Sequence, residues 1–105
     1  MSIFNFFSNH SDFASGIEQA NNTSNAVLLD VRTVQEYANG HVPGSVNMPL
    51  DRLETIKLSK NNPVFVYCRS GSRSRQACRY LRTYGYSVTD IGGIADYRGK
   101  LEKGV

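Results

Sequence analysis

Two short apolar runs constrain the fold of this chain more than any other feature. The first is Ala26–Leu29, which is followed by Asp30, and the second is Pro63–Tyr67, which is followed by Cys68. Uninterrupted apolar runs of this length are typical of strands that are buried on both faces, as the strands of parallel sheets are. Because ligands of such sheets bind mainly at the carboxyl ends of the strands, the residues that follow each run are candidates for a functional site.

Helix signals alternate with these strand signals. Thr33 and Glu36 have the spacing of a capping box, which predicts a helix that ends at Gly40. The alternation predicts an α/β layer fold with a mainly parallel sheet. The other expected elements are a helix capped by Ser11 or Asp12 and running to Gln19 with Phe13, Ile17 and Ala20 on one face, a short strand at Ser45–Met48, a helix capped by Asp51, a helix over Ser74–Thr83, and a strand over Ser87–Ile91.

Length and composition fit one domain. The chain has 105 residues, of which 40% are hydrophobic, as in ordinary globular proteins. It has no stretch of the ~20 apolar residues that a membrane-spanning helix needs. Its aromatic first residues lack the basic start and the small-residue cleavage site of a signal peptide. We therefore expect a single domain over residues 1–105, with residues 1–10 as a loosely packed extension, and a cytoplasmic location.

The chain has two cysteines, Cys68 and Cys78, with no C-x-x-C pair. Both histidines are far from the cysteines in sequence, so no metal site is expected. Cys78 shares the apolar stripe of the predicted helix with Ala77 and Leu81, which favours a place in the core. The alternative is that Cys78 is a resolving thiol, which would form a disulfide with Cys68 under oxidation.

Positive charge is concentrated around Cys68. Residues 55–89 contain no acidic residue and seven basic ones, although the whole chain has a net charge of only +3. A solvated basic helix face would explain this run, but a concentrated positive field also attracts anions. The arginines gather in and just after the segment that begins at Cys68, which suits a small anion better than the extended footprint of a nucleic acid.

Residues 68–73 form a predicted loop between a strand and the first turn of a helix. The free N–H groups at the start of that helix favour an anion, and small or flexible residues let the loop N–H groups curve inward as an anion-binding nest. The positive charge of the nearby arginines is a third effect. Each of the three stabilises a thiolate, the nucleophilic form of cysteine. The alternative is that Cys68 is only a buried residue at a strand end. The residues concerned are Cys68, Arg69, Ser70, Gly71, Ser72, Arg73 and Ser74.

Three blocks of the chain resemble the rhodanese (sulfurtransferase) family in its single-domain form. LLDVRTVQEYANGHVPGSVNMP, residues 28–49, resembles the N-terminal signature of the family. VFVYCRSGSRS, residues 64–74, resembles its active-site strand and loop, and GGIADY, residues 92–97, resembles its C-terminal signature. Tyr97 stands where the family often has tryptophan. The resemblance extends from about Phe13 over nearly the whole chain, and it implies a three-layer fold with helices on both sides of the sheet.

The resemblance implies a reaction for Cys68. The cysteine would attack the outer sulfur of a donor such as thiosulfate, become a persulfide, and pass that sulfur to cyanide or to a thiol such as thioredoxin or glutathione. Arg69 and Arg73 would position the donor and stabilise the departing sulfite. The resemblance implies no metal and no organic cofactor. We also expect neither nucleic acid nor a membrane as a partner, because the basic residues are clustered and the chain has no long apolar stretch.

Asp30 and Arg32 belong to the first block and end the first predicted strand. We expect them to brace the Cys68 loop by hydrogen bonds rather than to take part in catalysis. His41 lies in the turn-rich segment that follows, where Gly40 and Pro43 set the backbone path. We expect a structural role for His41.

Two other functions stay open. A phosphatase or arsenate reductase of the same fold would need a Cys-x5-Arg loop, whereas here Ser74 occupies the arginine position and Arg73 comes one residue too early. A persulfide carrier dedicated to a protein partner would use Cys68 in the same way but would receive its sulfur from a protein donor such as a cysteine desulfurase.

Overall fold

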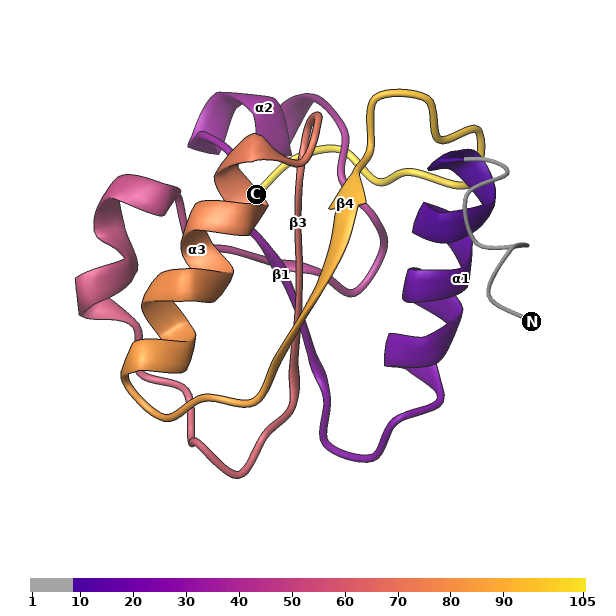
Figure 1. Cartoon of the computed structure of the whole chain (residues 1–105). Coiled ribbons are helices and arrows are strands. Elements are labelled where there is room, and N and C mark those ends of the chain that lie inside the picture. Colours follow the sequence, from indigo (N-terminus) through magenta and orange to yellow (C-terminus); the bar gives the residue numbers. More distant parts are fainter. Residues whose placement is uncertain (1–8) are drawn as a thin grey trace.

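The computed structural model describes residues 9–105, with side chains from residue 13 onward. Of the expected N-terminal extension, residues 1–8 lie outside the described part, and residues 9 and 10 already belong to the first helix (Figure 1). In chain order the elements are α1 (Asn9–Asn21), β1 (Val27–Asp30), α2 (Val34–Asn39), β2 (Val46–Asn47), the 3-10 helix η2 (Leu50–Thr55), β3 (Val64–Cys68), α3 (Ser72–Thr83) and β4 (Val88–Gly93).

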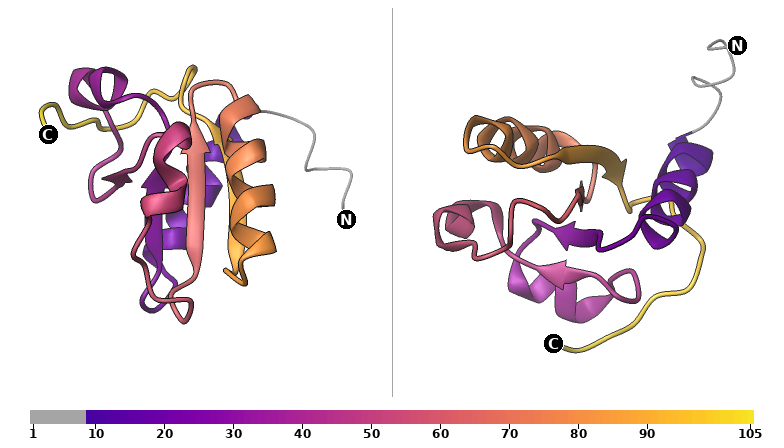
Figure 2. Two further views of the ribbon diagram at one scale, coloured as in Figure 1. Left: turned by 90° about the vertical axis from the view of Figure 1, so that its left-hand side faces the viewer. Right: turned by 90° about the horizontal axis from the view of Figure 1, so that it is seen from below.

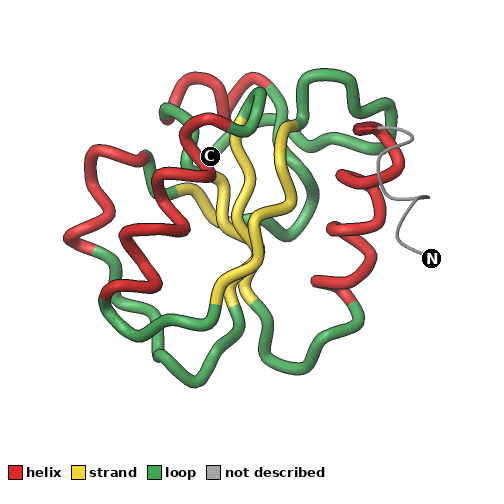
Figure 3. Tube along the Cα trace, viewed as in Figure 1, coloured by secondary structure: helices red, strands yellow, loops and turns green. Residues whose placement is uncertain are grey.

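Four parallel strands form one sheet in the order β2-β1-β3-β4. The two apolar runs of the sequence are β1 and β3, which pair with each other in the middle of the sheet. Figure 3 shows the strands between helices, and Figure 2, viewed from below, shows α1 on one side and α3 with η2 on the other. The predicted α/β fold with a parallel sheet between two helical layers is therefore confirmed.

β3 divides the core because its side chains alternate between the two faces of the sheet. Phe65 and Tyr67 pack with α1, whereas Val64, Val66 and Cys68 pack with α3 and η2. All five residues of β3 are buried, and burying an apolar side chain of this size contributes roughly 1.5–3 kcal/mol. This alternation places the Cys68 side chain on the α3 side.

α1 packs one apolar face against the sheet, as its sequence pattern predicted. Phe13, Ile17 and Ala20 are all buried in that face. The helix begins at Asn9, so the expected cap at Ser11 or Asp12 is wrong. It starts about one turn before Phe13, the first apolar residue of the predicted face. No helix within residues 9–105 is both long and apolar enough to cross a lipid bilayer.

α2 has the predicted capping box. The Glu36 N–H donates to Thr33 Oγ1 (3.1 Å), and the Thr33 N–H donates to Glu36 Oε1 (2.9 Å). The helix ends before Gly40, as expected. The helix expected to be capped by Asp51 is instead the 3-10 helix η2, in which Asp51 lies in the first turn and Pro49 precedes the start. Pro49 provides no side-chain cap; instead, the Leu50 N–H at the start of η2 donates to the Val31 carbonyl at 3.0 Å.

The structure shifts the boundaries around Cys68. Cys68 is the last residue of β3, and α3 begins at Ser72 rather than at the expected Ser74. Gly71 makes the earlier start feasible because its φ of 104° lies in the left-handed region, which glycine adopts without a steric penalty. The loop between strand and helix is therefore only residues 69–71, and Ser72, Arg73 and Ser74 supply the free N–H groups of the first helical turn.

Candidate active site

The Cys68 sulfur lies where β3 meets the first turn of α3. The Gly71 N–H donates to Cys68 Sγ at 3.0 Å and the Ser74 N–H donates to it at 3.3 Å. The side chain is almost completely buried, with 1% of the residue exposed. Two backbone donors on one sulfur, at the start of a helix, stabilise negative charge on that sulfur. The structure thus brings together the groups that the loop sequence indicated.

The loop backbone is held from the β4 side. The Ile94 N–H donates to the Cys68 carbonyl and the Ala95 N–H donates to the Arg69 carbonyl, both at 3.0 Å. Gly93 faces the same loop, and a Cβ on Gly93 would overlap the Arg69 carbonyl. Gly93 of the third sequence block therefore lets β4 approach the Cys68 loop.

The arginines near Cys68 differ in their partners. Arg73 donates to both carboxylate oxygens of Glu36, from Nη1 at 2.6 Å and from Nη2 at 3.0 Å. This hydrogen bond from Arg73 is the main cause that lowers the pKa of Glu36 to about 2. Arg69 and Arg75 are exposed, and within residues 13–105 no hydrogen bond or ion pair engages either guanidinium group. Arg69 is therefore the loop arginine whose charge is available to a bound anion.

Asp30 and Arg32 form a buried ion pair with an Nη2–Oδ2 distance of 2.7 Å. Arg32 Nη2 also donates to the Gly40 carbonyl at 2.7 Å, and Asn47 Nδ2 donates to the carbonyls of both Asp30 and Arg32. Among the described residues, no hydrogen bond joins either side chain to residues 68–74. The pair braces the turn at Gly40. The hydrogen bonds that we expected from these side chains to the Cys68 loop are not present among the described residues.

Tyr67, which the motif analysis missed, is a second organising residue at this end of the sheet. Its hydroxyl accepts from the Val42 N–H at 3.1 Å and lies 3.1 Å from Ser45 Oγ. The Arg32 guanidinium lies over its ring, 5.7 Å from the centroid. Burial raises the pKa of Tyr67, so it stays a neutral hydrogen-bonding group. In sequence it is only the last apolar residue of a strand.

His41 packs inside this arrangement. Its ring stacks on Tyr37 with a centroid distance of 3.6 Å, and its Nδ1 lies 2.7 Å from the Tyr37 carbonyl oxygen. The backbone of His41 also pairs with that of Glu102. These contacts agree with the structural role that we expected.

Cys78 lies in the core on the buried face of α3, as predicted, and neither cysteine forms a disulfide. Burial, followed by the charge of Asp90, raises the pKa of the Cys78 thiol to about 11, so Cys78 stays protonated at neutral pH. A resolving role for Cys78 stays a prediction. Within the described residues, no group of three or more His, Cys, Asp or Glu side chains is arranged to hold a metal ion.

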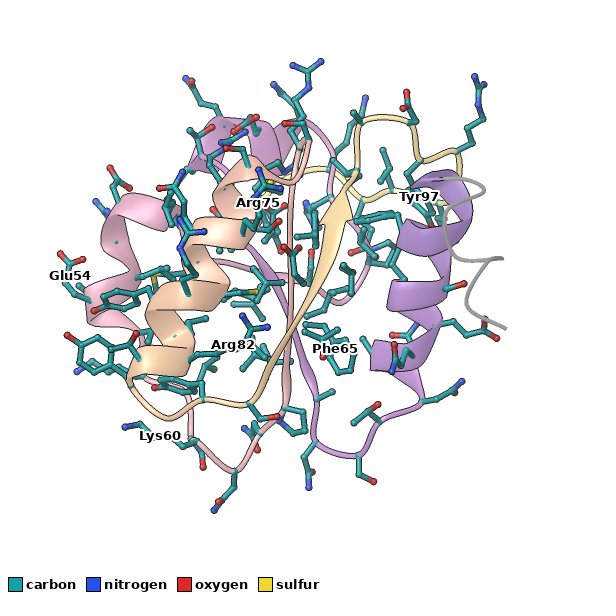
Figure 4. The ribbon with its side chains drawn as sticks, in the orientation of Figure 1. Glu54, Lys60, Phe65, Arg75, Arg82 and Tyr97 are labelled. Atoms are coloured by element: carbon teal, nitrogen blue, oxygen red, sulfur yellow. The ribbon has the colours of Figure 1, made fainter. Side chains whose placement is uncertain are left out.

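Two cavities flank the Cys68 loop. The larger, about 470 Å³, is bounded by the loop, the first turn of α3, the end of β4 and α1. In Figure 4, its residues Arg75 and Tyr97 lie on opposite sides of the tip of β4. The smaller, about 350 Å³, lies toward α2 and is lined by Arg32 and Glu36. Arg69 lines both cavities, so it is placed to contact a ligand in either one.

Comparisons with known proteins agree with this geometry. The family model for the rhodanese-like domain matches residues 12–100. A sulfurtransferase of Allochromatium vinosum is 37% identical over 96 residues, covering 89% of this chain and 84% of the relative. Thiosulfate sulfurtransferase PspE of Escherichia coli is 38% identical over 81 residues, covering 72% and 78%. YrkF of Bacillus subtilis is 35% identical over 79 residues, covering 71% of this chain, but the chain spans only 43% of its length.

Solved structures show the same fold. A rhodanese with anions from Escherichia coli has a TM-score of 0.65 and 37% identity, covering 75% of this chain and 99% of that one. A rhodanese-like domain protein from Staphylococcus aureus has a TM-score of 0.73 and 25% identity, covering 87% and 93%. Since the family match runs over most of the chain and relatives above 30% identity are covered by more than two thirds, this chain belongs to the rhodanese-like domain family, with sulfur transfer as its supported chemistry.

Proposed function

We propose that this protein transfers sulfane sulfur from thiosulfate or a persulfide donor to a thiol or to cyanide, through a persulfide on Cys68. The observation that carries the proposal is the pair of N–H groups, from Gly71 and Ser74, that point at Cys68 Sγ. The same donors would hold the anionic terminal sulfur of a persulfide. No general base is needed, because the backbone itself stabilises the thiolate.

The first half-reaction forms one S–S bond and breaks another. The Cys68 thiolate attacks the outer sulfur of thiosulfate, and sulfite leaves with the electron pair of the S–S bond. In the second half-reaction a thiolate or cyanide attacks the terminal sulfur of the persulfide, and the Cys68 thiolate is the leaving group. Together, the two steps return the protein to its starting state without an external oxidant or reductant.

Arg69 is our proposed ligand for the sulfonate of the donor. It is exposed next to Cys68 and unpaired within the described residues, whereas the Arg73 guanidinium is held by Glu36. A guanidinium group binds such an oxyanion by charge-assisted hydrogen bonds. The names of two relatives support this donor class: PspE is a thiosulfate sulfurtransferase, and the Escherichia coli rhodanese structure contains anions.

We place a small thiol acceptor such as glutathione in the larger cavity. Its volume lies within the range of small-molecule sites, roughly 300–1,000 Å³. Arg69 and Arg75 offer guanidinium groups for the carboxylates of such a thiol. Arg75→Ala is therefore expected to raise the KM for glutathione about fivefold and to leave the KM for thiosulfate unchanged in a steady-state assay. Equal KM values for glutathione in variant and wild type would contradict this placement.

Intact-mass spectrometry tests the proposal directly. After incubation with thiosulfate, the wild-type protein should gain about 32 Da, one sulfur atom, and should lose it when cyanide is added with formation of thiocyanate. Cys68→Ala is the inactive control and Cys78→Ala should still be loaded. If the wild type gains no mass and forms no thiocyanate, thiosulfate is not the donor.

Loading by a protein donor is the main alternative. YrkF, of which this chain spans only 43%, is named a sulfur carrier protein. A carrier dedicated to a partner would gain the same mass from a cysteine desulfurase with cysteine, but not from thiosulfate. Parallel incubations with the two donors distinguish these functions.

Phosphatase or arsenate reductase chemistry has less support. The position that would hold the phosphate-binding arginine is Ser74, whose side chain is fully buried and hydrogen-bonded. Hydrolysis of a general phosphatase substrate at a rate that depends on Cys68 would overturn our choice.

A further inference from the structure

Asp90, on the edge strand β4, connects that strand to the first turn of α3. Its Oδ1 accepts hydrogen bonds from Ser74 Oγ at 2.8 Å and from the Gly92 N–H at 2.9 Å. Asp90 is the first acidic residue after the acid-free segment 55–89. The Asp90 carboxylate thus contacts the acid-free, basic segment, and the residue that it binds there is Ser74.

Ser74 carries this contact to the reacting sulfur. Its N–H donates to Cys68 Sγ. Its hydroxyl also lies 3.1 Å from the carbonyl oxygen of Gly71, and the Gly71 N–H is the second donor to the sulfur. Because the residue is fully buried, its rotamer is restricted, and the orientation of its hydroxyl is tied to that of its backbone. Hydrogen bonds to a carboxylate are stronger than those to a neutral carbonyl, so Asp90 is the stronger anchor of the hydroxyl.

The backbone of β4 places the carboxylate at this point. The register between β3 and β4 shifts between Val66 and Tyr67, so that Val66 pairs with Asp90 while Tyr67 pairs with Gly92. Irregularities of this kind redirect side chains and recur next to active sites. At this shift the Gly92 N–H donates to the Asp90 carboxylate, which fixes the carboxylate from its own strand.

We propose that Asp90 is a positioning residue: by holding the Ser74 hydroxyl, it keeps the Ser74 N–H directed at the Cys68 sulfur. Its negative charge alone would disfavour a thiolate or persulfide nearby, so its benefit has to come from the hydrogen bonds. For its effect on turnover this inference rests on the proposed sulfurtransferase function.

Asp90→Ala and Asp90→Asn separate geometry from charge, because both remove the charge but only Asn keeps an oxygen acceptor. We expect Asp90→Ala to form the persulfide about tenfold more slowly than Asp90→Asn at saturating thiosulfate, with the KM for thiosulfate changed less than about twofold. Thr89→Ala, an exposed neighbour on the same strand, should behave as wild type. Single-turnover kinetics followed by mass spectrometry give these rates.

A double-mutant cycle tests whether Asp90 acts through Ser74. Ser74→Ala should slow persulfide formation about as much as Asp90→Ala, and the double variant should be no slower than either single variant. Equal rates for Asp90→Ala and Asp90→Asn, or fully additive effects in the double variant, would overturn the inference. Thermal unfolding midpoints identify any variant that fails to fold. If Asp90→Ala fails to fold, the rate of persulfide formation in Asp90→Asn is compared with that of the wild type.

Alkylation by iodoacetamide makes the test independent of the proposed function. The reagent is neutral, and peptide mapping separates Cys68 from Cys78. Asp90→Ala should react more slowly at Cys68 than Asp90→Asn even if thiosulfate is not the donor. A wild type that takes no sulfur from thiosulfate would therefore refute the donor assignment, whereas equal alkylation rates in the two variants would refute the role of Asp90.

Discussion

Arg69 and Arg73 are close to Cys68 in sequence, and the structure gives their guanidinium groups different surroundings. Arg73 is bound through both terminal nitrogens to Glu36, whereas Arg69 faces both cavities and has no ion-pair partner within residues 13–105. A paired guanidinium has less charge and fewer donors left for a ligand. At the scale of single residues, we therefore propose that Arg69 binds the anion, whereas Arg73 holds the first turn of α3 to Glu36.

Arg69→Ala is expected to raise the KM for thiosulfate about tenfold, since a charge-assisted hydrogen bond to a ligand contributes on the order of 1.4 kcal/mol. The kcat should change less, because the N–H groups on Cys68 Sγ are unaffected. Steady-state kinetics with thiosulfate and cyanide measure both constants. Arg79→Ala, an exposed arginine farther along α3, is the matched control, and an equal rise in KM for both variants would point to general charge rather than to Arg69.

Glu36 joins two elements that are far apart in sequence. Its carboxylate completes the capping box of α2 through Thr33 and at the same time binds Arg73 in the first turn of α3. A negative charge is also favourable at the N-terminal end of α2. At the scale of elements, the Glu36 carboxylate ties α2 to the first turn of α3, the helix that follows the Cys68 loop.

The pH dependence of stability should report this contact. The pKa of Glu36 is lowered from 4.5 to about 2 in the folded protein, mainly by the hydrogen bond from Arg73. A lowered folded-state pKa means that the ionised form stabilises the fold above about pH 4.5, and that this contribution is lost as the pH falls toward 2. Glu36→Gln should lower the free energy of unfolding by about 1–2 kcal/mol at pH 7.

Chemical denaturation at several pH values checks this expectation. The difference in unfolding free energy between wild type and Glu36→Gln should shrink between about pH 4.5 and about pH 2. A difference that stays constant over this range would show that the ionised carboxylate is not the source of the stabilisation. Glu54→Gln, on an exposed residue of η2, is the control.

The approach of β4 to the Cys68 loop depends on Gly93. A Cβ at this position would overlap the Arg69 carbonyl, so Gly93→Ala must displace the loop and is expected to destabilise the protein by about 2 kcal/mol and to slow sulfur transfer at least tenfold. Gly16→Ala is a matched control, because its Cβ would overlap Ile91 on the α1 side. It should lose stability while keeping most of the activity, and comparable activity losses in both variants would contradict the specific role of Gly93.

The whole molecule presents its charge unevenly. The sheet separates an α1 side from an α3 side, and the acid-free segment 55–89 runs through β3 and α3 (Figure 1). From a net charge of +3 with this distribution, we expect a positive field around the Cys68 loop. Such a field raises the local concentration of small anions and steers them to the site.

Ionic strength should therefore affect anionic and neutral reagents differently. The Debye length falls from about 10 Å at 0.1 M salt to about 3 Å at 1 M, so the KM for thiosulfate should rise severalfold over this range. The rate of Cys68 alkylation by neutral iodoacetamide should change much less. Parallel salt titrations of the two reactions measure this difference, and an equal response would exclude steering by the field.

Local sequence patterns were sufficient for much of the fold. The apolar runs identified β1 and β3, and Thr33 with Glu36 identified the capping box, because each of these signals depends on neighbouring residues. The start of α3 was misplaced by two residues, because a serine is acceptable at either position and only the left-handed Gly71 decides where the helix begins. Asp51 failed as a cap for a similar reason, since Pro49 already starts η2.

By itself, the sequence determined the class of fold and the position of Cys68 at a strand end, and it predicted an anion-binding loop after that strand. Only the tertiary structure decided that Glu36 takes up Arg73, that Asp30 and Arg32 brace the turn at Gly40, and that Asp90 reaches Ser74. The physical reason is that strand and helix signals are carried by adjacent residues. These three contacts instead depend on strand register and side-chain direction, which arise only when distant segments pack together.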